Sequence, residues 1–163
     1  VKEVLSTFDG PVVLDADGIN VLAGHIDILR GRTGQTILTP HEGEFKRIGG
    51  SLENGRVEAA MQFAKDSKSI LLLKGHNTVI SDGSTCYINP TGNPGMATGG
   101  SGDLLGGIIA SFISQGVDVF RSAIAGVYIH GMTGDAVTEK YSMMGNTPSL
   151  MLKELPRVLG CFE

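Results

Sequence analysis

A glycine-rich stretch, Gly92–Asp103, combines the residue types and spacing best suited to chemistry in this sequence. Apolar residues with the spacing of a helix that buries one face follow it directly, namely Leu104, Leu105, Ile108, Ile109, Phe112 and Ile113. Gly99, Gly100 and Gly102 let the main chain approach a ligand closely, and the free N–H groups and dipole of a helix N-terminus favour phosphate. The stretch therefore predicts a phosphate-binding loop at the start of a helix.

Asp103 falls in the first turn of that predicted helix. A bound polyphosphate would repel its carboxylate while the helix end holds it, which suits a group that receives a proton from a reacting hydroxyl. The alternative is that Asp103 only caps the helix and the glycines only make a turn. The number of glycines before a buried helix favours the ligand site.

Three other glycine motifs do not fit this stretch. The dinucleotide pattern G-x-G-x-x-G fails because Leu105 stands where the last glycine belongs, and the Walker pattern fails because Ser101, not lysine, follows Gly100. A serine nucleophile elbow fails because Asp103 replaces its second glycine.

Two predicted strands each deliver polar residues at their carboxyl ends, where open α/β sheets bind ligands. Residues 11–14 lead to Asp15 and Asp17, whose alternative role is to cap the next helix and bond loop amides, and both readings stay open. Residues 37–39 lead to Pro40 and an acidic segment typical of a helix start, so Glu42 is assigned to the helix dipole.

A third strand is predicted at residues 70–73, which are continuously apolar as in strands buried on both faces. It delivers Lys74–Thr78, where a lysine beside a glycine can reach a polyphosphate as a point charge. The alternative is an ordinary turn before the predicted hairpin of residues 79–80 and 85–88, whose Asp-Gly turn is typical of hairpins.

Helical patterns fill the rest of the chain. We expect the end of a helix at residues 1–8, a short helical stretch at 19–29, and a packing helix at 54–68. Further helices are expected after Asp118 and after Thr147-Pro148. The order of elements predicts one layered α/β domain with a mostly parallel sheet. We expect His130 and Asp135 to lie in a packed helix, with the histidine hydrogen-bonded. Core or subunit contacts are expected for Met143, Met144 and Met151.

Composition narrows the classes of partner. The 163 residues carry a net charge of −4 without a basic block, which argues against nucleic acid and anionic membrane surfaces as main partners. No segment approaches the roughly 18 continuous apolar residues of a membrane span. Cys86 and Cys161 lack metal-ligand spacing and are read as two reduced thiols, so we expect a cytoplasmic protein.

The segment 89–107, with its TGNPGMATGGSGD run, resembles the signature of the ADP- or ATP-dependent NAD(P)H-hydrate dehydratases, a branch of the ribokinase-like superfamily. Segments 14–20, 38–44 and 73–80 share the resemblance. Where many ribokinase-like kinases have Asn-x-x-Glu, this chain has His41-x-x-Glu44, as the hydrate dehydratases do. The resemblance therefore implies that His41 contacts the substrate. The nucleotide-binding residues that it implies are Lys74, Gly75, His76, Asn77, Thr78, Gly99, Gly100 and Gly102.

The resemblance implies repair of NADH hydrate and NADPH hydrate with ADP or ATP as co-substrate and Mg²⁺. Asp103 would contact the substrate and take the proton of the ring hydroxyl, while the amides of residues 99–102 stabilise the transferring phosphoryl group. Two alternatives are a kinase for a vitamin precursor or sugar, and a catalytically silent nucleotide-binding module. ADP or ATP preference stays open, as do the roles of Asp15, Asp17 and Glu44.

Family members extend beyond Val1 on the N-terminal side. We therefore expect residues 1–163 to be a single domain that forms the C-terminal portion of a ribokinase-like layered fold and lacks its N-terminal strands. We also expect a homo-oligomer, because such a truncation would expose a sheet edge and core that a neighbouring copy covers.

Overall fold

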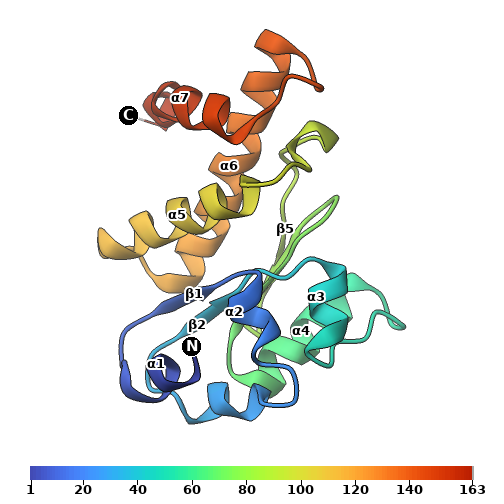
Figure 1. Ribbon diagram of the computed structural model, residues 1–163, viewed down its shortest axis with the longest axis vertical. Helices are drawn as coiled ribbons and strands as arrows, with labels where there is room; N and C mark the ends of the chain where they lie inside the picture. Colours follow the sequence, from blue (N-terminus) through green and yellow to red (C-terminus); the bar gives the residue numbers. More distant parts are fainter. Residues whose placement is uncertain (163) are drawn as a thin grey trace.

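A five-stranded sheet forms the middle layer of the computed structural model, which describes residues 1–162 (Figure 1). Its strands, in spatial order, are β1 (Val12–Leu14), β2 (Thr36–Leu38), β3 (Ile70–Leu73), β4 (Val79–Ser81) and β5 (Cys86–Ile88). β1, β2 and β3 run parallel, and the hairpin of β4 and β5 adds antiparallel strands beside β3. In the hairpin turn, Asp82 Oδ1 accepts N–H groups of Ser84 and Thr85 at 2.8 and 2.7 Å, as the Asp-Gly pattern predicts.

The helices of the first half of the chain cover one face of the sheet (Figure 1). They are α1 (Lys2–Thr7), α2 (Asp17–Asn20), the 3₁₀ helix η1 (Ile26–Gly31), α3 (Glu42–Arg47) and α4 (Arg56–Ser67). Leu71 and Leu73 point to this side and pack with buried residues that include Phe45. The alternation of a strand thus gives every second residue of β3 to this core.

The other face is covered by α5 (Ser101–Ser114) and α6 (Val119–Tyr141), with α7 (Pro148–Leu159) packed on α6 (Figure 1). Ile70 and Leu72 of β3 point to this side and meet Ile109 of α5. Two further 3₁₀ helices are η2 (Pro94–Met96) and η3 (Gly160–Phe162). The predicted α/β layers are confirmed, and among residues 1–162 we find no helix with the length and apolar character needed to cross a membrane.

Predicted helix starts are confirmed where a cap was recognised. Asp118 accepts the N–H of Arg121 at 3.0 Å at the start of α6, and the Thr147 side chain accepts the N–H of Leu150 at 3.4 Å at the start of α7. Met151 is fully buried, while Met144 is 100% exposed. Met151 therefore makes the core contact that was one of the two predicted alternatives, while for the exposed Met143 and Met144 the predicted subunit contact stays a prediction.

One helix prediction is wrong in detail. The stretch 19–29 is not a single helix, because turns separate α2 from η1 and Gly24 takes a positive φ of 72° there. β1 ends at Leu14, so Asp15 lies just beyond the carboxyl end of the strand and Asp17 begins α2.

Candidate functional site

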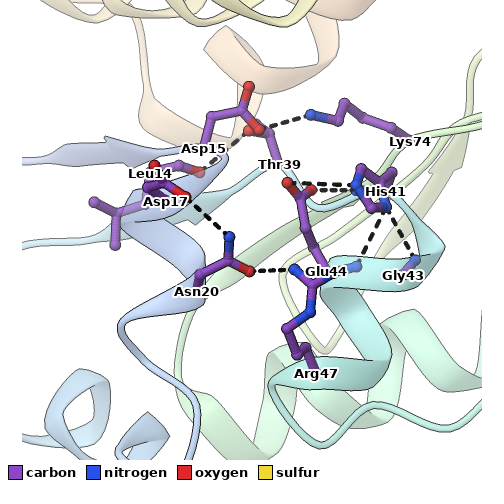
Figure 2. Close-up of polar contacts among 10 residues, drawn as sticks. All are labelled: Leu14, Asp15, Asp17, Asn20, Thr39, His41, Gly43, Glu44, Arg47 and Lys74. Carbon is purple, nitrogen blue, oxygen red and sulfur yellow. Dashed lines mark hydrogen bonds and ion pairs between the residues drawn. The ribbon is translucent and has the colours of Figure 1, made fainter.

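The carboxyl ends of β1 and β3 bring a lysine and a carboxylate to the N-terminus of α5. Lys74 Nζ donates to Asp15 Oδ1 at 2.6 Å, and Figure 2 shows the two side chains pointing toward each other. Gly102 lies beside them, because a Cβ at that position would stand 2.7 Å from Asp15 Oδ2 and 3.6 Å from Lys74 Nζ. The ammonium group is therefore close to the predicted phosphate-binding loop.

Main-chain amides are open on this loop. Ser101 donates its N–H to the carbonyl of Thr98 at 3.2 Å, so that one amide is used internally. In the part of the chain that the structure describes, the N–H groups of Gly99, Gly100 and Gly102 have no hydrogen-bond acceptor. Gly100 has φ +89°, a conformation that strains other residues, and this turn starts α5 with its amides free.

The turn after β3 is fixed by hydrogen bonds from two side chains. Thr78 Oγ1 donates to the carbonyl of Gly75 at 2.9 Å, and Arg56 Nη2 donates to the carbonyls of Leu73 and Lys74 at 2.9 and 3.2 Å. Glu42 forms an ion pair with Arg56. Glu42 therefore does more than serve the helix dipole, because it orients the arginine that holds the Lys74 turn.

A cavity of about 570 Å³ opens between this turn, the glycine-rich loop and α6, a volume typical of small-molecule sites. Its lining includes His41, Lys74, Gly75, His76, Asn77, Thr78 and Gly102 among the predicted site residues, with Ser101, Leu105, Val127 and His130 as apolar and polar wall. Gly99, Gly100 and Asp103 lie outside this lining. The structure thus brings the predicted nucleotide residues together, apart from two glycines of the loop.

Asp103 lies in the first turn of α5, as predicted, and its side chain is exposed. Within residues 1–162 its carboxylate accepts no hydrogen bond and forms no ion pair. Its role as proton acceptor stays a prediction.

His41 has a structural task that the sequence reading missed. Its Nδ1 accepts the N–H groups of Gly43 and Glu44 at 3.0 and 3.2 Å, and Glu44 Oε2 accepts the His41 N–H at 2.9 Å (Figure 2). This reciprocal capping box gives Glu44 a structural role at the start of α3. A capping residue followed three residues later by glutamate is the sequence pattern that indicates such a box. The ring still lines the cavity, so its predicted substrate contact stays a prediction.

Of the two alternatives given for Asp15 and Asp17, a ligand site or local support of a helix, each holds for one of them. Asp17 Oδ1 accepts the side-chain amide of Asn20 at 3.2 Å, which is a local bond at the start of α2 (Figure 2). Asp15 instead pairs with Lys74, a residue 59 positions away. Asp15 therefore belongs to the site, and Asp17 supports the adjacent helix.

His130 of α6 is buried at the cavity wall. Its Nε2 lies 3.3 Å from Ser101 Oγ, which confirms the prediction of a packed, hydrogen-bonded histidine. Burial lowers the pKa of His130 from 6.5 to about 4, and the positive charge of Lys74 lowers it as well. The ring is neutral at pH 7. The sequence did not indicate that His130 lies beside α5, because helical spacing shows which face is buried but not what that face contacts.

The low pKa of His130 predicts a loss of stability in acid. The unfolded chain binds a proton at this histidine more readily than the folded one, so stability is complete above about pH 6.5 and is lost as pH falls toward 4. Between pH 7 and pH 5 the free energy of unfolding should fall by about 2 kcal/mol from this group. Urea unfolding of wild type and His130→Asn at pH 7 and pH 5 measures this fall in the free energy of unfolding. The fall should be smaller by about 2 kcal/mol in the variant. Equal falls in both proteins would contradict the lowered pKa of His130.

A second depression and the residue types that bind metals both bear on the extent of the predicted site. A second depression of about 620 Å³ is lined by Lys65, Lys68, Asp82 and their neighbours, and it contains none of the predicted site residues. Across residues 1–162 no three His, Cys, Asp or Glu side chains gather as a metal site, and Cys86 and Cys161 are free thiols.

The profile of the NAD(P)H-hydrate dehydratase family matches residues 1–157. The bifunctional NAD(P)H-hydrate repair enzyme Nnr of Moorella thermoacetica is 44% identical over 169 aligned residues, which cover 100% of this chain and 32% of that protein. A crystal structure of the ADP/ATP-dependent NAD(P)H-hydrate dehydratase from Bacillus subtilis, co-crystallized with ATP/Mg²⁺, matches with a TM-score of 0.86 at 35% identity, over 97% of this chain and 57% of that one. A ribokinase-like superfamily protein from Enterococcus faecalis, 22% identical, matches with a TM-score of 0.74 over 98% of this chain and 66% of its own.

These likenesses confirm the ribokinase-like fold. The chain spans 32% of the length of the Moorella relative and 57% of the Bacillus chain. The predicted place of residues 1–163 as the C-terminal portion of a longer domain stays a prediction.

Proposed function

Because this chain belongs to the NAD(P)H-hydrate dehydratase family, we propose that the protein converts NADH hydrate and NADPH hydrate back to NADH and NADPH with ADP or ATP as co-substrate. The observation that carries the proposal is the meeting of the Lys74–Asp15 pair with the free amides at the start of α5. A lysine and a helix N-terminus together favour a polyphosphate. Lys74 and Gly102 line a cavity large enough for a nucleotide.

In the proposed reaction the ring hydroxyl of the hydrate attacks the terminal phosphorus of the nucleotide. The hydroxyl proton passes to Asp103, a new O–P bond forms, and the bond from phosphorus to the bridging oxygen breaks, which releases AMP from ADP or ADP from ATP. Phosphate is a far better leaving group than hydroxide, so the ring C–O bond then breaks as phosphate departs, and a neighbouring ring carbon gives its proton to water. The open amides of Gly99, Gly100 and Gly102 stabilise the charge of the transferring group, which is the main contribution that a protein makes to phosphoryl transfer.

Mg²⁺ would neutralise phosphate charge when bound, and the residues present fit such an ion. Magnesium in nucleotide sites is held by one or two carboxylates plus substrate phosphates rather than by a protein cage. Asp15 supplies one carboxylate beside Gly102, and the described part of the chain has no cluster of three ligands. Asp15 would therefore hold the ion together with the nucleotide.

A spectroscopic assay of the purified protein tests the function. NADH hydrate is incubated with ADP or ATP, and NADH absorbance and free phosphate are followed together. Equal amounts of NADH and phosphate support the proposal. A stable phosphorylated product would identify a small-molecule kinase, and nucleotide binding without consumption of hydrate would identify a silent binding module. The expected homo-oligomer and cytoplasmic location stay predictions.

Removing the charge of Lys74 should weaken nucleotide binding. We expect Lys74→Met to raise the Kd for ADP about 10- to 150-fold, because a charge-assisted contact to phosphate contributes ~1.5–3 kcal/mol. Calorimetric titration with ADP measures the Kd of both proteins. Lys68→Met is the matched control, since Lys68 lies at the second depression instead of the site. Equal Kd values for wild type and Lys74→Met would exclude Lys74 as a phosphate ligand.

A further inference from the structure

The loop 92–98, which forms one wall of the cavity, is attached to α6 by hydrogen bonds to Asp135 and Thr138. Asp135 Oδ2 accepts the main-chain N–H of Gly92 at 2.8 Å, and Asp135 Oδ1 accepts the side-chain amide of Asn93 at 2.8 Å. Asn93 Oδ1 in turn accepts the N–H of Gly95 at 3.0 Å and the hydroxyl of Thr138 at 3.0 Å. The start of η2 is therefore tied to two side chains of the same helix.

The hydrogen-bond network continues beyond the loop. The buried Asn146 donates its Nδ2 to Thr138 Oγ1 and to the carbonyl of Gly134, each at 3.0 Å. This asparagine lies just before α7, so the segment between α6 and α7 joins the same network. The loop is thus held by a connected set of polar groups and not by one isolated bond.

Glycines on α6 let the loop lie directly on the helix. A Cβ at Gly134 would stand 2.3 Å from Met96 Sδ, and a Cβ at Gly131 would stand 2.1 Å from Thr91 Oγ1. A Cβ at Gly131 would also stand 2.8 Å from the main-chain carbonyl carbon of Thr91 and would push the chain outward at the start of the loop, whereas at Gly134 the Met96 side chain would have to move. Asp135 follows Gly134 immediately, so close approach and polar attachment occur at the same turn of α6.

We propose that Asp135 is a positioning residue for the nucleotide, which acts through Gly92 and Asn93 to hold the loop 92–98 in its binding shape before the ligand arrives. The inference rests on the proposed function, because it assigns the cavity to a nucleotide. A loop that is ordered in advance spares the ligand the entropy of ordering it on binding. Loss of the attachment therefore weakens binding and leaves the chemistry at saturation nearly unchanged.

The donor and acceptor pattern permits a reciprocal exchange. Asp135→Asn alone leaves an amide NH₂ facing the Asn93 NH₂, and Asn93→Asp alone brings two carboxylates together. In the double variant the new side-chain amide at position 135 donates to the new carboxylate at position 93, and the carbonyl of that amide accepts from Gly92. The second oxygen of the new carboxylate accepts from Gly95 and Thr138. All four contacts of the wild type are then possible again.

The experiment measures three quantities in wild type, both single variants and the double variant: the Kd for ADP, kcat at saturating ADP, and main-chain hydrogen exchange at positions 92, 93 and 95. Each single variant should raise Kd about tenfold and accelerate exchange, with kcat within about threefold. The double variant should recover most of the affinity and protection. Glu139→Gln is the matched control, because Glu139 is an exposed carboxylate one turn further along α6.

Two outcomes would overturn the inference. One is a single variant that is less stable but binds ADP as wild type does, which would make the network merely structural. The other is a double variant no better than the single variants, which would show that the four contacts do not act together. If the wild-type protein fails to bind ADP, the proposed function is wrong. Hydrogen exchange at positions 92, 93 and 95 would still show whether Asp135 holds the loop 92–98 in place.

Discussion

Asp103→Asn is expected to lower kcat about a thousandfold while the Kd for the nucleotide stays within about threefold, because general-base catalysis contributes ~10²–10⁴-fold. The amide is nearly the same size as the carboxylate but cannot take the proton of the ring hydroxyl. Asp103 is exposed and forms no bond within residues 1–162, so its replacement removes no observed contact. The loss of a negative charge at a helix N-terminus costs only ~0.3–1 kcal/mol of stability.

Stopped-flow or steady-state production of NADH from NADH hydrate measures this effect, with calorimetry for the nucleotide. Asp118→Asn is the control, because Asp118 is also a carboxylate at a helix start and asparagine caps as well as aspartate. Its kcat should equal that of wild type. Near-normal turnover of Asp103→Asn would remove Asp103 from the reaction and leave the loop as a binding element alone.

Much of the fold could be read from the sequence because its signals are local. The continuous apolar run 70–73 is β3, the Asp-Gly turn closes the hairpin, and Asp118 and Thr147 cap the helices that they were predicted to start. The glycine-rich stretch likewise runs into α5, whose first turn holds Asp103. Each of these features depends on residues within about one turn of each other.

The contacts that shape the site are not local, and the sequence reading missed them. Asp15 and Lys74 are 59 residues apart, and Asp135 lies 43 residues from Gly92. Periodicity indicates which face of α6 is buried, but it does not say that Ser101 meets His130 there. Local signals also failed between α2 and η1, where a glycine with positive φ interrupts a pattern that favours one helix.

The second large effect is expected from Gly102→Ala, which should raise the Kd for ADP about 10- to 100-fold, because a displaced Lys74 would lose a charge-assisted contact to phosphate that contributes ~1.5–3 kcal/mol. The added methyl would stand 2.7 Å from Asp15 Oδ2, so the Asp15–Lys74 pair must move away from the free amides. The fold should tolerate the change: alanine is favoured over glycine in a helix by ~1 kcal/mol, which offsets the loss of a partly exposed ion pair.

Gly106→Ala separates this local effect from a change in helix stability. Gly106 lies on the same helix, and a Cβ there meets no atom within 4 Å. That variant should be more stable by up to ~1 kcal/mol and bind ADP as wild type does. If both variants lose affinity equally, the stiffness of α5 and not the space above Gly102 controls binding. If neither loses affinity, the position of the Asp15–Lys74 pair beside Gly102 does not control nucleotide binding.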